Sequence, residues 1–134
     1  MGQRRVCVVS GSSSGIGAAT VRRYAREGWD VVINYSRQAE PAEAVALACR
    51  ALGAQALVVR ANVADDADCR RLAAEVEAQF GRADVLVNNA GTTKFVAMKN
   101  LEGLSAEDFQ AIYAVNVIGA YQLSRAFEIG RAHV

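Results

Sequence analysis

The chain has little of what metal sites, secreted proteins and nucleic-acid-binding proteins are built from. Its only histidine is His133, and its three cysteines are scattered without a C-x-x-C pair, so no metal site is predicted. The net charge is +1 and the basic residues form no block, which argues against nucleic acid or an anionic membrane as a partner. The apolar run Val6-Cys7-Val8-Val9 is too short for a signal peptide or a membrane span. We therefore expect a cytoplasmic protein with reduced, packed cysteines.

The chain does contain a glycine- and serine-rich stretch, from Ser10 to Gly17, between that apolar run and a helical pattern. A strand, a glycine turn and a helix in this order bring backbone N–H groups and a helix N-terminus to one point, where a phosphate can bind. The spacing is G-x-x-x-G-x-G. We expect Gly11 to take a positive φ, Gly15 to let the backbone approach a ligand, and Gly17 to let the helix lie close to the strand.

The remaining sequence alternates between short apolar, β-branched runs and amphipathic patterns. Strands are predicted over 5–10, 30–35, 56–63 and 84–88. Helices are predicted over 16–27, from near Pro41 until Gly53 ends the helix, from a cap at Asp65 or Asp66 until Gly81, and from 106 to about 127. The first helix is expected to face the sheet with Ile16, Thr20 and Tyr24, and the second with Val45, Cys49 and Leu52. This order predicts an α/β fold, a doubly wound parallel (Rossmann) sheet of about four βα units with strand order 3-2-1-4. The ligand is expected at the switch point between strands one and four.

Polar segments follow the later strands. They are Asn34-Tyr35-Ser36-Arg37, Asn62-Val63 and Asn88-Asn89-Ala90-Gly91, and Asn116-Val117-Ile118-Gly119 lies on the last helix. Together with the glycine turn these segments resemble the short-chain dehydrogenase/reductase family over about residues 4–127. The pairing of G-x-x-x-G-I-G with N-N-A-G is the most specific part of the resemblance. Within the family, V-I-N-Y and N-V-A-D are similar to 3-oxoacyl-acyl-carrier-protein reductases.

The resemblance implies a role for each of these segments. The glycine turn would hold the pyrophosphate and ribose of a nicotinamide cofactor, through Gly11, Ser13, Ser14, Gly15, Ile16 and Gly17. Asn62, where the family has Asp, would accept a hydrogen bond from the adenine amino group, and Val63 would offer its backbone N–H. The N-N-A-G segment would place Asn89, Ala90 and Gly91 beside the nicotinamide ribose and would also stabilise a turn at the end of the sheet. Asn116 matches the family's catalytic Asn, which holds a water in a proton relay, whereas an isolated helical Asn bonds only locally.

The end of the second strand bears on cofactor choice. An acidic residue there would bind the ribose 2′-OH of NAD and repel a 2′-phosphate. Tyr35, Ser36 and Arg37 stand there instead, and no acidic residue follows before Glu40. Because Ser36 and Arg37 can donate hydrogen bonds to a phosphate, NADP is predicted in preference to NAD. The alternative is that Arg37 is only a solvated surface charge.

The family's catalytic Ser and Tyr-x-x-x-Lys are not found, and in the family they follow the next strand. Tyr121 is followed four residues later by Arg125 and not by Lys. Residues 128–134 fit the translation of a sequencing-library adapter and its stop codon. We therefore expect residues 1–127 to be an incomplete dinucleotide-binding domain and 128–134 a non-native tail. The sequence predicts an inactive fragment of an NADP(H)-dependent oxidoreductase that interconverts a small-molecule carbonyl and alcohol, homo-oligomeric at full length. The alternative is a non-catalytic dinucleotide-binding module. Such a fragment would leave the fourth strand with a free edge.

Overall fold

A four-stranded parallel sheet with strand order β3-β2-β1-β4 forms the centre of the protein. The computed structural model describes residues 4–129. The strands are β1 (Val6–Val9), β2 (Asp30–Tyr35), β3 (Ala56–Arg60) and β4 (Val85–Val87). The helices are α1 (Gly15–Arg26), α2 (Ala39–Ala51), α3 (Asp66–Phe80), α4 (Ala106–Tyr113) and α5 (Gly119–Ile129), with a short 3₁₀ turn η1 (Leu101–Gly103) and a π turn η2 (Ala114–Ile118). The predicted fold class and strand order are confirmed.

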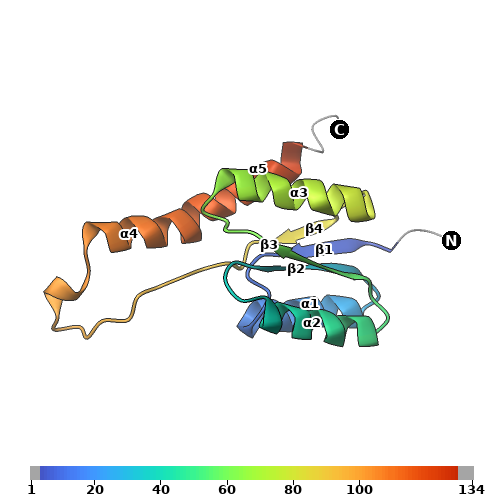
Figure 1. Cartoon of the computed structure of the whole chain (residues 1–134), viewed down its shortest axis with the longest axis horizontal. Helices are drawn as coiled ribbons and strands as arrows, with labels where there is room; N and C mark the ends of the chain where they lie inside the picture. Colours follow the sequence, from blue (N-terminus) through green and yellow to red (C-terminus); the bar gives the residue numbers. More distant parts are fainter. Residues whose placement is uncertain (1–3, 130–134) are drawn as a thin grey trace.

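Helices cover both faces of the sheet. Figure 1 shows α1 and α2 on one face and α3 with α5 on the other. Along β1 the side chains alternate between two cores: Cys7 and Val9 pack on the α1 and α2 side, and Val6 and Val8 on the α3 and α5 side. All four residues are at most 1% exposed, as expected for a parallel strand covered on both faces. The apolar run that the sequence analysis singled out is therefore the middle of the sheet.

Two predictions about helix faces were wrong. Ile16 is 80% exposed and Leu52 is 43% exposed, although both were expected to face the sheet. The inner face of α1 is formed by small residues and one valine: Gly17, Ala18, Val21 and Ala25. Tyr24, which was also expected to face the sheet, is partly buried and packs against this core. Large apolar residues at helical spacing therefore indicate the inner face of α1 only in part.

The third strand is shorter than predicted, because β3 ends at Arg60 and not at Val63. Beyond it the chain turns toward α3, where Asp65 is the N-cap and its side chain accepts a hydrogen bond from the Ala67 N–H at 3.0 Å. A side-chain acceptor at this position satisfies an N–H group that has no partner within the helix. The apolar residues Ala61 and Val63 are still buried, but against α3 and α5 and outside the sheet ladder.

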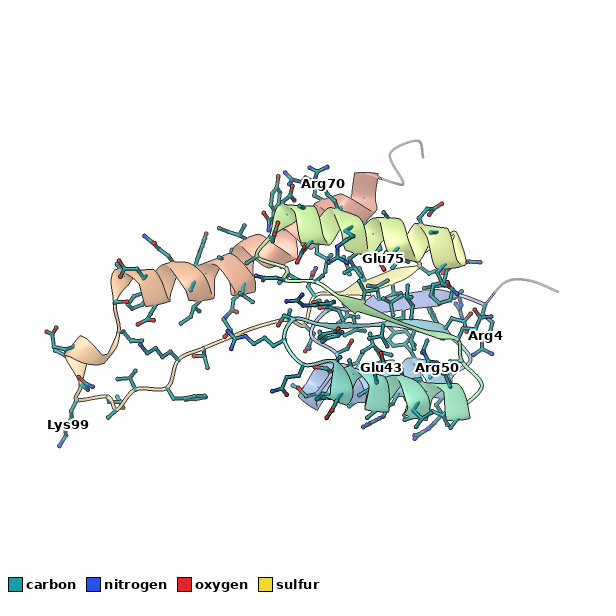
Figure 2. All side chains as sticks on the ribbon, viewed as in Figure 1. Arg4, Glu43, Arg50, Arg70, Glu75 and Lys99 are labelled. Carbon is teal, nitrogen blue, oxygen red and sulfur yellow. The ribbon has the colours of Figure 1, made fainter. Side chains whose placement is uncertain are left out.

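The last predicted helix is interrupted. It consists of α4, the π turn η2 and α5, and α4 together with the segment before it extends beyond the sheet (Figure 1). Figure 2 places Lys99 at the far end of this extension. A capping box between Ser105 and Asp108 begins α4. Large apolar side chains on the extension are exposed, among them Phe95, Met98, Leu101 and Phe109.

The outer edge of β4 is free, as expected, because β1 is its only partner strand among the described residues. A groove of about 1020 Å³ lies beside it, lined by residues of α3, β4 and α5 such as Val76, Leu86 and Phe127. Glu128 still belongs to α5. The boundary after residue 127 and the non-native tail stay predictions, and residues 130–134 lie outside the described part of the chain.

A carboxylate joins the starts of β1 and β4. Asp84 accepts two hydrogen bonds from the Arg82 guanidinium, at 2.6 and 2.8 Å, and one from the Val6 N–H at 2.8 Å. The Arg82 hydrogen bonds, followed by the Val6 N–H, outweigh desolvation and hold the pKa of Asp84 below its usual range. A lowered pKa in the folded state means that ionised Asp84 stabilises the fold. This contribution is present at neutral pH and is lost as the pH falls below about 4.

We expect Asp84→Asn to lower the free energy of unfolding by about 1 kcal/mol at pH 7 and by progressively less as the pH falls below about 4. Urea unfolding of the wild type and the variant across this pH range measures the difference. The matched control is Glu27→Gln, because Glu27 forms an exposed ion pair with Arg23 at 3.1 Å that is expected to contribute little. A pH-independent difference between wild type and Asp84→Asn would contradict the assignment.

Candidate cofactor site

The glycine turn between β1 and α1 has the predicted backbone geometry. Gly11 has φ 62° and Gly15 has φ 57°, which are conformations that side chains strongly disfavour. A Cβ on Gly11 would lie 2.8 Å from the Cα of Ala90, so the turn and the segment after β4 are in direct contact. A Cβ on Gly15 would meet no atom within 4 Å. The turn is therefore packed against the segment after β4 at Gly11 and has open space at Gly15.

A buried asparagine of β2 holds the turn. Asn34 is 2% exposed, and its Oδ1 accepts a hydrogen bond from the Gly11 N–H at 2.9 Å. Its Nδ2 donates to the carbonyl oxygens of Val59 at 3.2 Å and Ala61 at 3.1 Å. One side chain thus links the ends of three neighbouring segments of the sheet. Because the site is buried, losing this side chain would take a hydrogen-bond partner from several backbone groups.

Two buried serines complete the network. The Ser12 hydroxyl donates to the Val9 carbonyl at 2.7 Å and accepts from the Asn34 N–H at 3.0 Å. The Ser10 hydroxyl oxygen accepts from the N–H groups of Asn89 and Ala90, both at 3.0 Å. The polar network of Ser10, Ser12, Asn34 and Asn89, called the turn network below, contains no ionised group. It positions the turn without placing a charge where an anionic cofactor would bind.

The N-N-A-G segment stabilises the turn. The Nδ2 of Asn89 donates to the carbonyl oxygens of Ser10 at 3.1 Å and Gly11 at 3.0 Å. The backbone of Asn89 and Ala90 is bound to Ser10 as well. The predicted role of the N-N-A-G segment in stabilising a turn is therefore confirmed. The placement of Asn89, Ala90 and Gly91 beside a nicotinamide ribose stays a prediction.

The N-terminus of α1 has no side-chain cap. Ser14 occupies the N-cap position but its hydroxyl forms no capping hydrogen bond, and the first turn holds no acidic residue. By contrast, α4 is capped by Ser105, whose oxygen accepts from the Asp108 N–H at 3.2 Å. The first N–H groups of a helix need an acceptor and carry partial positive charge. At α1 they lie beside the open side of Gly15, so the residues present fit a phosphate group there.

At the end of β2, Tyr35 is partly buried, whereas Ser36 and Arg37 are exposed. Arg37 takes part in no ion pair within the described residues. The Ser36 carbonyl accepts a hydrogen bond from Nε of Arg60 at 3.2 Å. This end of the sheet therefore presents hydrogen-bond donors and positive charge. Arg60 lies outside the motifs from which the cofactor-binding residues were predicted.

The structure changes the expectation for Asn62. Its Oδ1 already accepts from the Ala64 N–H at 3.0 Å in a local turn, and its own N–H donates to Asp68 at 2.8 Å. The carbonyl expected to face an adenine amino group is thus engaged, with one further lone pair left. Val63 is held from α5, because Gln122 Nε2 donates to its carbonyl at 2.9 Å. A Cβ on Gly119 would lie 2.6 Å from the Val63 side chain, so only glycine allows this contact.

Asn116 lies in the π turn and binds the segment after β4. Its Oδ1 accepts from the Thr92 N–H at 2.7 Å, and its Nδ2 donates to the Thr92 carbonyl at 3.0 Å. A π turn often marks a functional position in a helix. Each amide atom retains capacity for one further hydrogen bond. Asn116 can therefore hold the loop and bind a water at once, and its catalytic role stays a prediction.

The chain matches a known family along most of its length. Residues 5–128 match the model of the short chain dehydrogenases. This chain belongs to the short-chain dehydrogenase family. It is 43% identical over 121 residues to a protein named as a candidate ketoacyl reductase of the granaticin polyketide synthase from Streptomyces violaceoruber, covering 90% of this chain and 47% of that protein. It is 37% identical over 122 residues to a 3-oxoacyl-[acyl-carrier-protein] reductase from Synechocystis, covering 91% and 48%.

Solved structures agree with this membership. A short chain dehydrogenase from Burkholderia cenocepacia in complex with NADP superposes with a TM-score of 0.87 at 38% identity, covering 94% of this chain and 50% of that one. The chain thus spans about half the length of the relatives it matches. The resemblance inferred from the motifs is confirmed at the level of the family.

The three cysteines are free and buried. Burial raises the pKa of the Cys7 thiol to about 12 and that of Cys69 to about 11, so neither is a thiolate nucleophile at neutral pH. Within residues 4–129 no cluster of His, Cys, Asp and Glu could hold a metal ion. No helix of this part of the chain has the length and apolar character needed to span a membrane.

Proposed function

We propose that this short-chain dehydrogenase chain forms the cofactor-binding half of an NADP(H)-dependent oxidoreductase that interconverts a small-molecule carbonyl and alcohol. The observation that carries the proposal is the open glycine turn beside the uncapped N-terminus of α1. The turn lies where β1 is flanked by β2 on one side and β4 on the other. In doubly wound sheets this point, at the carboxyl ends of the strands, is where dinucleotides bind.

The residues around this point suit the parts of a dinucleotide. The N–H groups of Ser13, Ser14 and Gly15 and the start of α1 would bind the pyrophosphate, because the site offers donors and no carboxylate. Asn62 and Val63 would contact the adenine. Ala90 and Gly91 would lie beside the nicotinamide ribose. A bound nicotinamide would supply the hydride chemistry, while the chain would orient it.

Asn116 is proposed as a positioning residue for a bound water. Its remaining hydrogen-bonding capacity and its link to Thr92 support this role. The 134 residues contain no Tyr-x-x-x-Lys, so we expect the chain alone to bind cofactor without turning over a substrate. The complete protein is proposed to be cytoplasmic and homo-oligomeric. The exposed apolar side chains of α4, such as Phe109 and Tyr113, support an interface there.

Binding is tested by titrating the protein with NADPH and NADH and following the nicotinamide fluorescence. The proposal requires saturable binding, with NADPH bound more tightly than NADH. Absence of binding for both cofactors to a folded protein would overturn it. Turnover is tested on the complete protein that carries this chain, with NADPH and a panel of small β-keto esters. NADPH oxidation that depends on the ester would support the oxidoreductase assignment.

NADP is proposed over NAD because of Ser36 and Arg37. We expect Arg37→Ala to weaken NADPH binding by about tenfold or more and NADH binding by less than about twofold, since only NADPH carries a phosphate for the guanidinium. The control is Arg26→Ala, another exposed arginine, at the last turn of α1. It is expected to change neither affinity. Equal effects of Arg37→Ala on both cofactors would mean that Arg37 is only a surface charge.

A further inference from the structure

A second arginine lies at the same edge of the sheet. Arg60 is the last residue of β3, and its register partner on β2 is Tyr35, the residue before Ser36. Its Nε donates to the Ser36 carbonyl at 3.2 Å. The side chain is exposed and forms no ion pair within residues 4–129. The Arg60 guanidinium is therefore held by a hydrogen bond at Nε, and no carboxylate of the described residues pairs with its positive charge.

The neighbouring Arg71 shows the opposite situation. Its guanidinium lies 2.7 Å from Glu75 and 3.5 Å from Asp68, and it also donates to the carbonyl of Arg60. Asp68 in turn accepts the N–H of Asn62. The carboxylates on this side of β3 are thus engaged by Arg71 and the backbone. Arg60 keeps both Nη groups for another anion.

We propose that Arg60 is a second guanidinium that binds the 2′-phosphate of NADP, together with Arg37. This inference rests on the proposed function, which places the adenosine ribose beyond the end of β2. The Ser36 carbonyl holds Nε and so restricts the guanidinium before the ligand arrives, while the Nη groups can contact phosphate oxygens. Arg60 comes from β3 and Arg37 from the segment after β2. A 2′-phosphate between them would be contacted from two elements that the sheet holds in register.

The proposal is tested on the adenosine half of the cofactor alone. The probes are adenosine 2′,5′-bisphosphate, which carries the 2′-phosphate, and 5′-AMP, which lacks it, both measured by calorimetric titration. Arg60→Gln is expected to weaken binding of the bisphosphate by about tenfold to a hundredfold, and binding of 5′-AMP by less than about twofold. Arg60→Lys keeps the charge without the planar fork, so an intermediate loss is expected.

Arg50→Gln is the matched control. Arg50 donates to the carbonyl of Ala56 at 2.8 Å, so it contacts the same strand β3, but at its first residue. Figure 2 shows Arg50 at the end of α2 that lies on the same side of the molecule as Arg4. Its loss removes a comparable arginine–carbonyl contact far from the proposed phosphate. Both probes are expected to bind this variant as they bind the wild type.

The outcomes distinguish a failure of the Arg60 proposal from a failure of the proposed function. Equal weakening of both probes by Arg60→Gln would mean that Arg60 only braces the end of β2, and no weakening would mean that it does not contact the ligand. Either result overturns the proposal. If the wild type binds both probes equally well, the preference for NADP fails along with Arg60, whereas dinucleotide binding stands. If it binds neither, the proposed function fails as well.

Discussion

Asn34→Ala is expected to lower the free energy of unfolding by about 3–4 kcal/mol, because the Gly11 N–H and the carbonyls of Val59 and Ala61 lose a partner inside the protein. Asn34 is 2% exposed and its hydrogen bonds to the Val59 and Ala61 carbonyls are buried, so water does not replace these two without local opening. The loss falls on the glycine turn, and cofactor binding is expected to weaken together with stability. Urea unfolding followed by circular dichroism measures the first effect, and NADPH titration the second.

Asn100→Ala is the control for Asn34→Ala. Asn100 is exposed, and its side chain forms no capping hydrogen bond at η1. Its replacement is expected to change the free energy of unfolding by less than about 0.5 kcal/mol. A similarly small change for Asn34→Ala would contradict the central place of the turn network. It would mean that the surrounding structure or a water molecule supplies new hydrogen-bond partners to the three backbone groups at little cost in free energy.

The sheet was predictable because its signal is local and repeated. Each strand is a short apolar run between polar turns, and β2 was predicted with its observed bounds, Asp30–Tyr35. The alternation of strands and helices indicated a parallel sheet, and the strand order was predicted from the doubly wound pattern. Gly11 was predicted correctly as a residue with positive φ, since a tight strand-to-helix turn requires one. These features depend on neighbouring residues and on chain chirality.

The turn network was not predicted, since its contacts join residues far apart in the chain. Asn34 contacts Gly11, 23 positions away, and Asn89 contacts Gly11 across 78 positions. A polar residue inside an apolar strand, such as Asn34 after Val31-Val32-Ile33, was the available signal. A buried amide in such a place has to find several partners. The same reasoning extends to Ser10 and Ser12, which directly flank the first glycine.

The motif residues form intramolecular contacts at the site where they are expected to bind the cofactor. Asn89 binds the turn, Asn116 binds Thr92, and Gly119 allows contact with Val63. Family resemblance points to these residues but does not separate cofactor contact from scaffolding. By contrast, Gly15 has open space beside it, Arg37 is exposed, and the hydrogen bond of the Arg60 side chain within the described residues is the one to the Ser36 carbonyl. Binding experiments on the two arginines are therefore cleaner tests of function than substitutions within N-N-A-G.

Gly17→Ala is expected to destabilise the fold by about 2–3 kcal/mol, although the same change in an open helix would stabilise it by about 1 kcal/mol. A Cβ at this position would lie 2.5 Å from Nδ2 of Asn89, 2.6 Å from the Gly11 carbonyl oxygen and 2.9 Å from the Cα of Ser12. Two of these atoms are backbone, and the Asn89 amide is held by two hydrogen bonds. None can move without disturbing the turn, so the steric cost exceeds the gain in helix propensity.

The measurement for Gly17→Ala pairs urea unfolding with NADPH titration, and Gly91→Ala is the control for unfolding. A Cβ on Gly91 would meet its nearest neighbour, Oδ1 of Asn116, at 3.5 Å, which is an ordinary contact distance. Its effect on the free energy of unfolding is expected to stay within about 1 kcal/mol. If Gly17→Ala instead raises stability, as propensity alone predicts, then α1 can withdraw from the turn. The close approach of α1 would then be a preference of the fold and not a requirement, and the NADPH titration of the same variant would show whether this movement of α1 weakens cofactor binding.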